Sequence, residues 1–396
     1  MKQSFFLIFP MVLSNNSSLF FAFSIHFSLF KYCWKKSSLK ILKRHRSKKE
    51  RPSIVTSTMS SAAAAAAGDD GKEERNKIHT VEHASSGASV GIHPFGATVI
   101  SYRTTCNNNR EEEEEKTTTT VEHLFLSRDA KLDGSKAIRG GIPLVFPIFG
   151  PSSGADNTMP QHGFARNNHW TLQPASVYDT NESAGCSYQL NFPDDVSAGR
   201  GSNNPWATGD SELSCRLVYA VDFNGSRLKT TLTIENTSTS GNEFDFQALF
   251  HTYYQVHDSN SLNADQCFVR GLENYAVADK VLKTDGQPNT EGTITISAET
   301  DRVYSPTSAC SSTVKAIIGV GNNRTVELTA AGCDSNKEEA PVSAVVWNPF
   351  KEKAMAMSDF GSDQYEDMLC VEPGILQPQQ NLKPGQTFVF EQVLEV

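Results

Sequence analysis

From His79 to the C-terminus, short segments rich in β-branched and aromatic residues alternate with turn-forming residues. The clearest pair is 215–223 and 227–235, which flanks Asn224-Gly225, a dipeptide favoured in tight hairpin turns. No long amphipathic helix and no internal repeat interrupts the pattern. Many short strands with turns between them predict an all-β chain folded as a large antiparallel β-sandwich. Further strands are expected at 97–103, 121–127, 170–174, 186–192, 244–256, 267–272, 293–297, 315–320, 325–329, 343–347, 368–371 and 387–393.

The N-terminal segment has a different composition from the rest of the chain. Residues 1–51 contain 11 Lys or Arg and a single acid, Glu50, which leaves 25 basic and 44 acidic residues in the remainder. A basic, Ser-rich and acid-poor segment is typical of an organelle transit peptide. A secretory signal around 19–30 and a single membrane span are the alternatives. We expect residues 1–75 to be a leader outside the fold, residues 76–396 to form one catalytic domain, and the protein to be cytoplasmic or chloroplastic.

The segment 137–170 is dense in Gly and Pro, which excludes a helix or a long ladder strand. It nevertheless places Arg139, Gln161, His162 and Arg166 among aromatic residues. Polar side chains on loops of fixed geometry often form binding sites. The competing interpretation is a surface loop with several turns.

His251 lies within the expected strand 244–256, whose two faces differ. Alternation places aromatic and small residues on one face, which we expect to be core. The other face is polar, which suggests the floor of a pocket: Asp245, Gln247, Leu249, His251 and Tyr253. A structural, hydrogen-bonded histidine is the alternative.

Glu372 follows the apolar segment 368–371 and precedes Pro373-Gly374, which we expect to end that strand. A carboxylate at a strand end is a common catalytic placement, although a solvated strand end has the same pattern. Asp301 precedes Arg302 in a β context, where a simple ion pair is the alternative to a binding role.

Motifs for metal or nucleotide binding are absent from the sequence. It has no HExxH, no P-loop and no GxGxxG that enters a helix. The eight cysteines are scattered, and none has the spacing of a zinc site. We therefore expect no cofactor and no metal, and the acidic body argues against nucleic-acid binding.

Six motifs occur in series along the chain, and together they resemble one family. They are RGGIPLVFPIFG (139–150), QHGFAR (161–166), FHTYY (250–254), DRVY (301–304), WNPF (347–350) and MLCVEPG (368–374). In this order they resemble the glucose-6-phosphate 1-epimerases, the hexose-6-phosphate mutarotase branch of the aldose 1-epimerase-like family. The resemblance covers about 79–396 and implies a galactose mutarotase-like supersandwich of β-strands.

The resemblance also implies chemistry. It makes His251 the general acid and Glu372 the general base of ring opening and closure, with which the α and β anomers of hexose 6-phosphates interconvert. The implied substrate-binding residues are Arg139, Gln161, Arg166 and Asp301, with His162 as an additional pocket residue. We expect a monomer that binds a small phosphosugar and whose catalytic domain contacts no membrane. An aldose 1-epimerase for unphosphorylated sugar and a non-catalytic carbohydrate-binding domain remain alternatives.

Overall fold

The computed structural model describes residues 75–107, 118–152, 159–193, 213–239 and 241–396. Residues 1–74 of the expected leader lie outside this part of the chain. All described residues belong to one compact unit, 60–396. Within the described ranges, no helix has the length and apolarity needed to cross a membrane.

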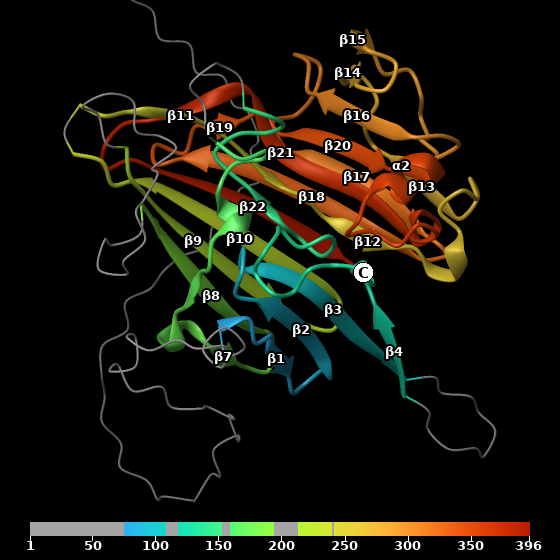
Figure 1. Ribbon diagram of the computed structural model, residues 1–396, viewed down its shortest axis with the longest axis horizontal. Coiled ribbons are helices and arrows are strands. Elements are labelled where there is room, and N and C mark those ends of the chain that lie inside the picture. Colours follow the sequence, from blue (N-terminus) through green and yellow to red (C-terminus); the bar gives the residue numbers. More distant parts are fainter. Residues whose placement is uncertain (1–74, 108–117, 153–158, 194–212, 240) are drawn as a thin grey trace, which may run out of the picture. The chain divides into compact units, whose positions relative to one another are not determined.

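Three antiparallel sheets make up the fold (Figure 1). The largest has ten strands. Its path is β13 (Cys267–Arg270), β17 (Val314–Val320), β18 (Thr325–Asp334), β22 (Thr387–Glu395), β10 (Arg227–Asn236), β9 (Cys215–Phe223), β8 (Ala184–Phe192) and β6 (Thr171–Leu172), with β19 (Glu339–Ala340) beside β18 and β7 (Tyr178–Asp179) beside β8.

An eight-stranded sheet packs on the ten-stranded one. Its path is β15 (Thr284–Pro288), β14 (Ala276–Asp279), β16 (Thr300–Ser305), β20 (Ser343–Asn348), β21 (Met368–Leu382), β11 (Phe244–Phe250) and β5 (Leu144–Val145), with β12 (Tyr253–Gln255) beside β21. The third sheet contains β1 (His79–His83), β2 (Ala88–His93), β3 (Thr98–Asn107) and β4 (Thr118–Glu122). The described residues include the short α-helix α2 (Phe350–Ala356) and 3-10 turns at 165–167, 174–176, 257–259 and 364–367.

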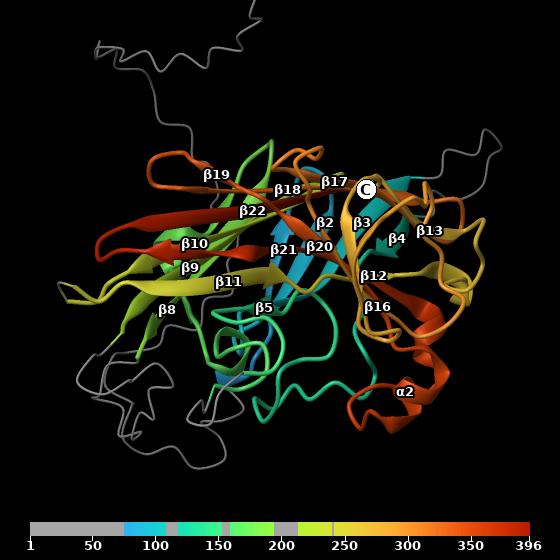
Figure 2. The ribbon, with the colours of Figure 1, turned by 90° about the horizontal axis from the view of Figure 1, so that it is seen from above.

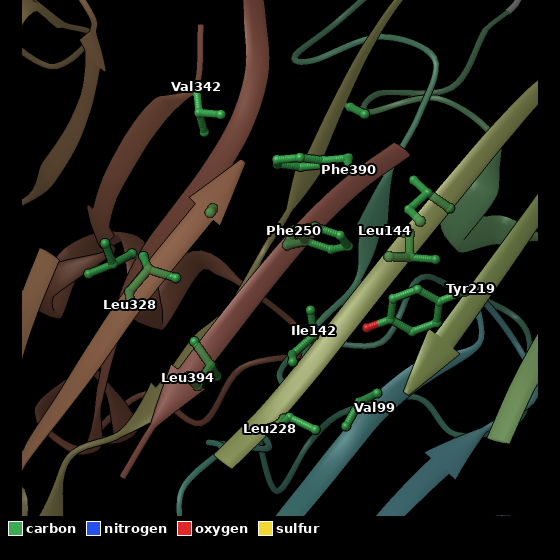
Figure 3. Close-up of a cluster of buried hydrophobic side chains, with 14 of the residues drawn as sticks. Val99, Ile142, Leu144, Tyr219, Leu228, Phe250, Leu328, Val342, Phe390 and Leu394 are labelled. Atoms are coloured by element: carbon green, nitrogen blue, oxygen red, sulfur yellow. The ribbon is translucent and has the colours of Figure 1, made fainter. Parts of the chain in front are cut away.

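The main hydrophobic core lies between the sheets. Alternate residues of the eight-stranded sheet, such as Phe246 and Phe250, point to the ten-stranded sheet, where Phe250 stacks on Phe390 with ring centroids 4.5 Å apart (Figure 3). Burying such aromatic side chains stabilises a fold by roughly 1.5–3 kcal/mol each. This apolar face of β11 is the one that the alternation in the sequence predicts.

The opposite face of the eight-stranded sheet carries a second cluster of buried residues, which includes Val145, Leu249, Tyr253 and Cys370. The segment after β4 and helix α2 lie on this side of the sheet, whereas β18 and β22 lie on the other (Figure 2). The candidate site is built on this second face, away from the main core.

The β-sandwich prediction is confirmed, and the hairpin β9–β10 forms as expected around Asn224, whose Oδ1 accepts the amides of Ser226 and Arg227. Several boundaries were wrong. The segment 293–297 is not a strand, since it makes only an isolated bridge at Ile294. The strand expected at 121–127 is β4, which ends at Glu122.

Two further differences concern the site. The expected strand 244–256 is interrupted at residues 251 and 252. The strand before Glu372 does not end there but continues as β21 to Leu382. Pro373 is tolerated because neither β11 nor β12 pairs with residues 371–373, so that side of the ladder requires no amide hydrogen there.

Candidate active site

The register of β21 brings His251 and Glu372 together. On one side of the interruption Leu249 pairs with Gly374, and on the other side Tyr253 pairs with Cys370. The same antiparallel register places His251 opposite Glu372. Residues that are directly opposite in an antiparallel pair share one face of the sheet. Both side chains therefore belong to the face that points away from the main core.

The interruption in the strand gives His251 its position. Around it the chain leaves β21 and bonds to the Gly-Pro-rich segment: the His251 amide donates to the Pro143 carbonyl at 3.0 Å, and the Tyr253 amide donates to the Gly141 carbonyl at 2.9 Å. The backbone groups freed from the ladder are thus satisfied. Only glycine fits at 141, where the segment lies against β3, because its φ is +65° and a Cβ would lie 2.1 Å from the Val99 carbonyl oxygen.

The His251–Glu372 pair is buried and only partly satisfied. His251 Nδ1 lies 3.3 Å from Glu372 Oε1, and the side chains are 10% and 2% exposed. The distance allows ion pairing, but the orientation makes no hydrogen bond, and Nδ1 and Oε2 have no partner among the described residues. Such atoms are costly to bury unless a ligand satisfies them. The alternative of a hydrogen-bonded structural histidine is therefore not supported.

Burial disfavours the charged form of both groups. It lowers the pKa of His251 well below its usual value, and the positive charges of Arg166 and Arg139 act in the same direction. Burial also raises the pKa of Glu372 well above its usual value, with a further contribution from Asp301. Burial therefore favours a neutral imidazole beside a protonated carboxyl group over the imidazolium–carboxylate ion pair, which carries the same number of protons. Acid–base catalysts in enzymes are commonly perturbed in this way.

Arg139 is held at the side of this pair. Its Nη1 donates to the Tyr253 hydroxyl at 3.1 Å, and its Nη2 contacts the carboxylate of Asp359 at 3.4 Å. Asp359 is buried and also pairs with Lys136 at 2.8 Å. These charges hold the pKa of Asp359 below its usual value against the effect of burial. Tyr253 was expected on the polar face of its strand, whereas no sequence signal marked Asp359.

The QHGFAR segment forms a turn that carries Gln161, His162 and Arg166. Gly163 has a φ of +74°, and a Cβ there would lie 2.0 Å from the Phe146 carbonyl oxygen, so only glycine fits. His162 Nδ1 accepts the Gly150 amide at 3.2 Å, and Arg166 Nη2 donates to the Gln161 carbonyl at 2.9 Å.

Positive charge gathers around this turn. Burial lowers the pKa of His162 to about 3, and the neighbouring positive charges act in the same direction. Burial also lowers the pKa of Arg166 to about 10, against the opposite effects of Tyr253, Glu372 and Asp359. The His162 ring lies 6.1 Å from the His251 ring. Arg166 has no carboxylate partner among the described residues, and its Nε is buried without a partner. A positive group in this state favours an anionic ligand.

The opposite wall is formed by β14 and β16. Asp301 of β16 pairs with Trp347 of β20 across the ladder, which places it on the same face as Glu372. Lys280, which directly follows β14, lies 3.6 Å from Asp301 and places its ammonium 4.1 Å from the centre of the Phe149 ring. Asp301 therefore has a partner in the cavity itself, rather than in Arg302, which pairs with Asp279 at 2.8 Å.

These walls enclose a cavity of about 380 Å³, a size suited to one small ligand. Six of the seven expected site residues line it: Arg139, Gln161, His162, His251, Asp301 and Glu372. The seventh, Arg166, lies beside the cavity rather than on its surface. The unexpected lining residues include Phe149, Lys280, Trp347, Lys353 and Met357. WNPF pointed to Trp347, but no sequence signal marked Lys280 or Lys353.

One cluster offers metal-ligand atoms. His251, Cys370 and Glu372 each present one such atom, and these lie within 4.8 Å of one another. The set contains nitrogen, sulfur and oxygen ligands of the kind zinc accepts. Ring opening of a sugar needs only proton transfer, for which a carboxylate and an imidazole are sufficient.

A β-sandwich whose cavity contains a buried imidazole and carboxylate together with several cations defines a class: acid–base enzymes that act on small polar molecules. The sequence profile of the family described as aldose 1-epimerase matches residues 77–395. The chain belongs to this family and is a sugar epimerase.

Relatives agree with this assignment. A protein of Cenchrus ciliaris, provisionally named glucose-6-phosphate 1-epimerase, is 34% identical over 269 residues, covering 67% of this chain and 72% of its own. An Escherichia coli protein with the same provisional name is 27% identical over 256 residues, covering 63% of this chain and 72% of its own. Among solved structures, a mutarotase, also provisionally named, from Salmonella typhimurium superposes with a TM-score of 0.58 at 22% identity, covering 81% of this chain and 90% of its own.

Proposed function

We propose that this protein interconverts the α and β anomers of glucose 6-phosphate and related hexose 6-phosphates. The observation that carries the proposal is the buried His251–Glu372 pair with unpartnered atoms in a cavity rich in cations. The provisional names of the relatives from Cenchrus ciliaris and Escherichia coli point to the same substrate.

In the proposed mechanism, Glu372 removes the proton from the C1 hydroxyl while His251 donates a proton to the ring oxygen. The C1–O5 bond breaks and leaves an open-chain aldehyde. Rotation about the C1–C2 bond presents the other face of the carbonyl to the C5 hydroxyl. On closure His251 takes the C5 hydroxyl proton and Glu372 returns a proton to the carbonyl oxygen. Each group of this kind contributes roughly 10²–10⁴-fold in rate.

The electrostatics of the His251–Glu372 pair fit the open-chain stage. Ring opening converts ionised Glu372 and protonated His251 into a neutral pair. Because burial favours the neutral forms of both groups, the cavity offsets part of the cost of opening the ring. Arg139, fixed by Asp359 and Tyr253, is a donor of defined geometry toward the sugar.

Two cations are proposed to bind the phosphate. Arg166 is half-buried, its Nε has no hydrogen-bond partner among the described residues, and a guanidinium suits a dianionic phosphate. Lys280 contacts Asp301 only at 3.6 Å, beyond a normal hydrogen bond, and otherwise rests on the Phe149 ring. Lys353, in contrast, is committed to Glu299 at 2.7 Å. Gln161, His162 and Asp301 are proposed to contact the sugar.

Anomer exchange measured by NMR saturation transfer tests the proposal, with glucose 6-phosphate and free glucose compared in parallel. His251→Ala is expected to lose exchange while the fold is retained. Arg166→Met and Lys280→Met are expected to raise KM for the phosphate ester by about 10–100-fold, as expected for losing a charge-assisted hydrogen bond, with little change for glucose. Lys229→Met is the matched control, because Lys229 also pairs with a carboxylate, Glu391, on the surface of the other sheet.

Equal losses for both sugars would contradict the phosphate assignment and favour an epimerase of unphosphorylated sugar. Saturable sugar binding without exchange in the wild type would instead favour a carbohydrate-binding role.

We also propose that the catalytic domain spans 76–396, acts as a monomer, and resides in the cytoplasm or the chloroplast according to residues 1–75. Uptake and processing of a reporter fused to residues 1–75 by isolated chloroplasts would support the plastid. A reporter left outside the organelle would support the cytoplasm. Light scattering of protein starting at Met59 tests the monomer.

A further inference from the structure

Cys370 is a buried thiol for which the proposed mechanism has no use. It lies two residues before Glu372 on β21, so that both side chains point to the same face of the sheet. Tyr253 is paired opposite Cys370, and His251 precedes Tyr253 by two residues. The strand register therefore gathers a thiol, an imidazole and a carboxylate at one point.

The geometry of this cluster is close to that of a zinc site. Zinc bonds to His nitrogen, Cys sulfur and carboxylate oxygen at about 2.0–2.3 Å, so that two ligands on a tetrahedral ion lie roughly 3.3–3.8 Å apart. His251 Nδ1 and Glu372 Oε1 already have a separation of 3.3 Å. All three ligand atoms lie within 4.8 Å of one another. Binding of one ion therefore requires the ligand atoms to move closer by up to about 1 Å.

Two of the three ligands are also unpartnered. His251 Nδ1 and Glu372 Oε2 are buried without a hydrogen-bond partner among the described residues. Both side chains line the cavity, so an ion can reach them from solvent. A buried lone pair without a donor is stabilised by a cation that it can coordinate.

We propose that His251, Cys370 and Glu372 form an inhibitory binding site for a thiophilic divalent cation, of which Zn²⁺ is the representative. Three protein ligands leave the fourth tetrahedral position open toward the cavity for water or a sugar oxygen. On binding, the Cys370 thiol and the Glu372 carboxyl group each release a proton to solvent, and a Zn–S bond and a Zn–O bond form. The ion then occupies both acid–base groups, so that bound metal and catalysis exclude each other.

A divalent cation can bind here although Arg139 and Arg166 are positively charged and lie near the site. A thiolate and a carboxylate together carry two negative charges, so the coordinated Zn²⁺ adds no net charge to the pocket. Magnesium and calcium, which prefer oxygen ligands, suit this set poorly.

The test compares wild type with Cys370→Ser and with Cys267→Ser, which changes another buried free cysteine on β13. Anomer exchange is measured against added Zn²⁺ and then after EDTA. We expect inhibition of wild type and Cys267→Ser that EDTA reverses, and at least about tenfold weaker inhibition of Cys370→Ser, since loss of a ligand weakens metal binding at least as much as loss of a supporting contact. Inhibition of equal strength in all three would overturn the site.

Cobalt spectroscopy gives a readout that does not depend on activity. Co²⁺ added to wild type is expected to produce a thiolate-to-cobalt charge-transfer band, which saturating substrate removes and which is absent from Cys370→Ser. A wild type without this band would overturn the proposal even if the serine variant failed to fold. A wild type with the band but without anomer exchange would refute the proposed function and leave the metal site standing.

Discussion

Replacing Glu372 with Gln should abolish catalysis and stabilise the fold. The glutamine keeps the shape of the side chain but can neither accept nor return the C1 hydroxyl proton. The side chain is 2% exposed, and burial raises the pKa of Glu372 well above its usual value. The folded state therefore disfavours the carboxylate that the proposed reaction requires, and the variant removes this unfavourable charge.

The size of the effect depends on pH in a defined direction. A carboxyl group whose pKa is raised on folding contributes stability below the pKa of the unfolded chain, and that contribution is lost as pH rises through the folded value. Wild type and Glu372→Gln should thus unfold at similar urea concentrations near pH 4. At pH 8 the variant should be more stable by about 1–3 kcal/mol, the usual cost of an unsatisfied buried polar group.

Urea unfolding at pH 4 and pH 8 checks the predicted change in stability. Anomer exchange measured at pH 7 checks the predicted loss of catalysis. Glu327→Gln is the matched control. It makes the same chemical change at an exposed position on β18, away from the site. Exchange of glucose 6-phosphate should fall by about 10²–10⁴-fold in Glu372→Gln only. A variant that keeps its activity, or that is destabilised at pH 8, would refute the assignment of a costly catalytic carboxylate.

Three further results are expected. Dialysis against EDTA should leave anomer exchange unchanged, since proton transfer alone is needed, and a loss restored by metal would contradict this. The free energy of unfolding should fall as pH drops from about 6.5 toward 3, because burial lowers the pKa of His162 to about 3 and, in this range, His162 takes up a proton only in the unfolded chain. His162→Gln should flatten this part of the profile of urea stability against pH. Phe250→Ala should destabilise the fold by about 3–5 kcal/mol in urea unfolding, since Phe250 is fully buried against Phe390, and an effect below 1 kcal/mol would contradict its place in the main core.

The β-sandwich could be predicted because its strands and turns are determined largely by residues that are neighbours in the sequence. Alternation in 244–250 and the turn at Asn224-Gly225 depend on neighbouring residues, and both appear in the structure as expected. The interruption after Phe250 could not be read in the same way. It arises because Gly141 and Pro143, more than a hundred residues earlier, take the backbone hydrogen bonds of His251 and Tyr253.

The same limit applies to the site. His251 and Glu372 were predicted as site residues because each occurs in a distinctive motif, but no local pattern places them opposite each other. Asp359 and Lys280 were missed because their roles come from tertiary contacts, with Arg139 in one case and with Phe149 and Asp301 in the other. A charged residue in a loop has the same sequence pattern whether it is solvated or lines a cavity.

The interruption of the strand links the fold to the chemistry. A continuous strand from 244 to 256 would pair every backbone group with β21 and would leave little freedom to place a histidine. Diverting residues 251 and 252 to the Gly-Pro-rich segment keeps the backbone satisfied, while β11 and β12 hold the register on either side. His251 is thereby fixed opposite Glu372 by two ladders rather than by a mobile loop. Catalytic groups need this fixed placement, since a displacement of about 1 Å can cost 10²-fold in rate.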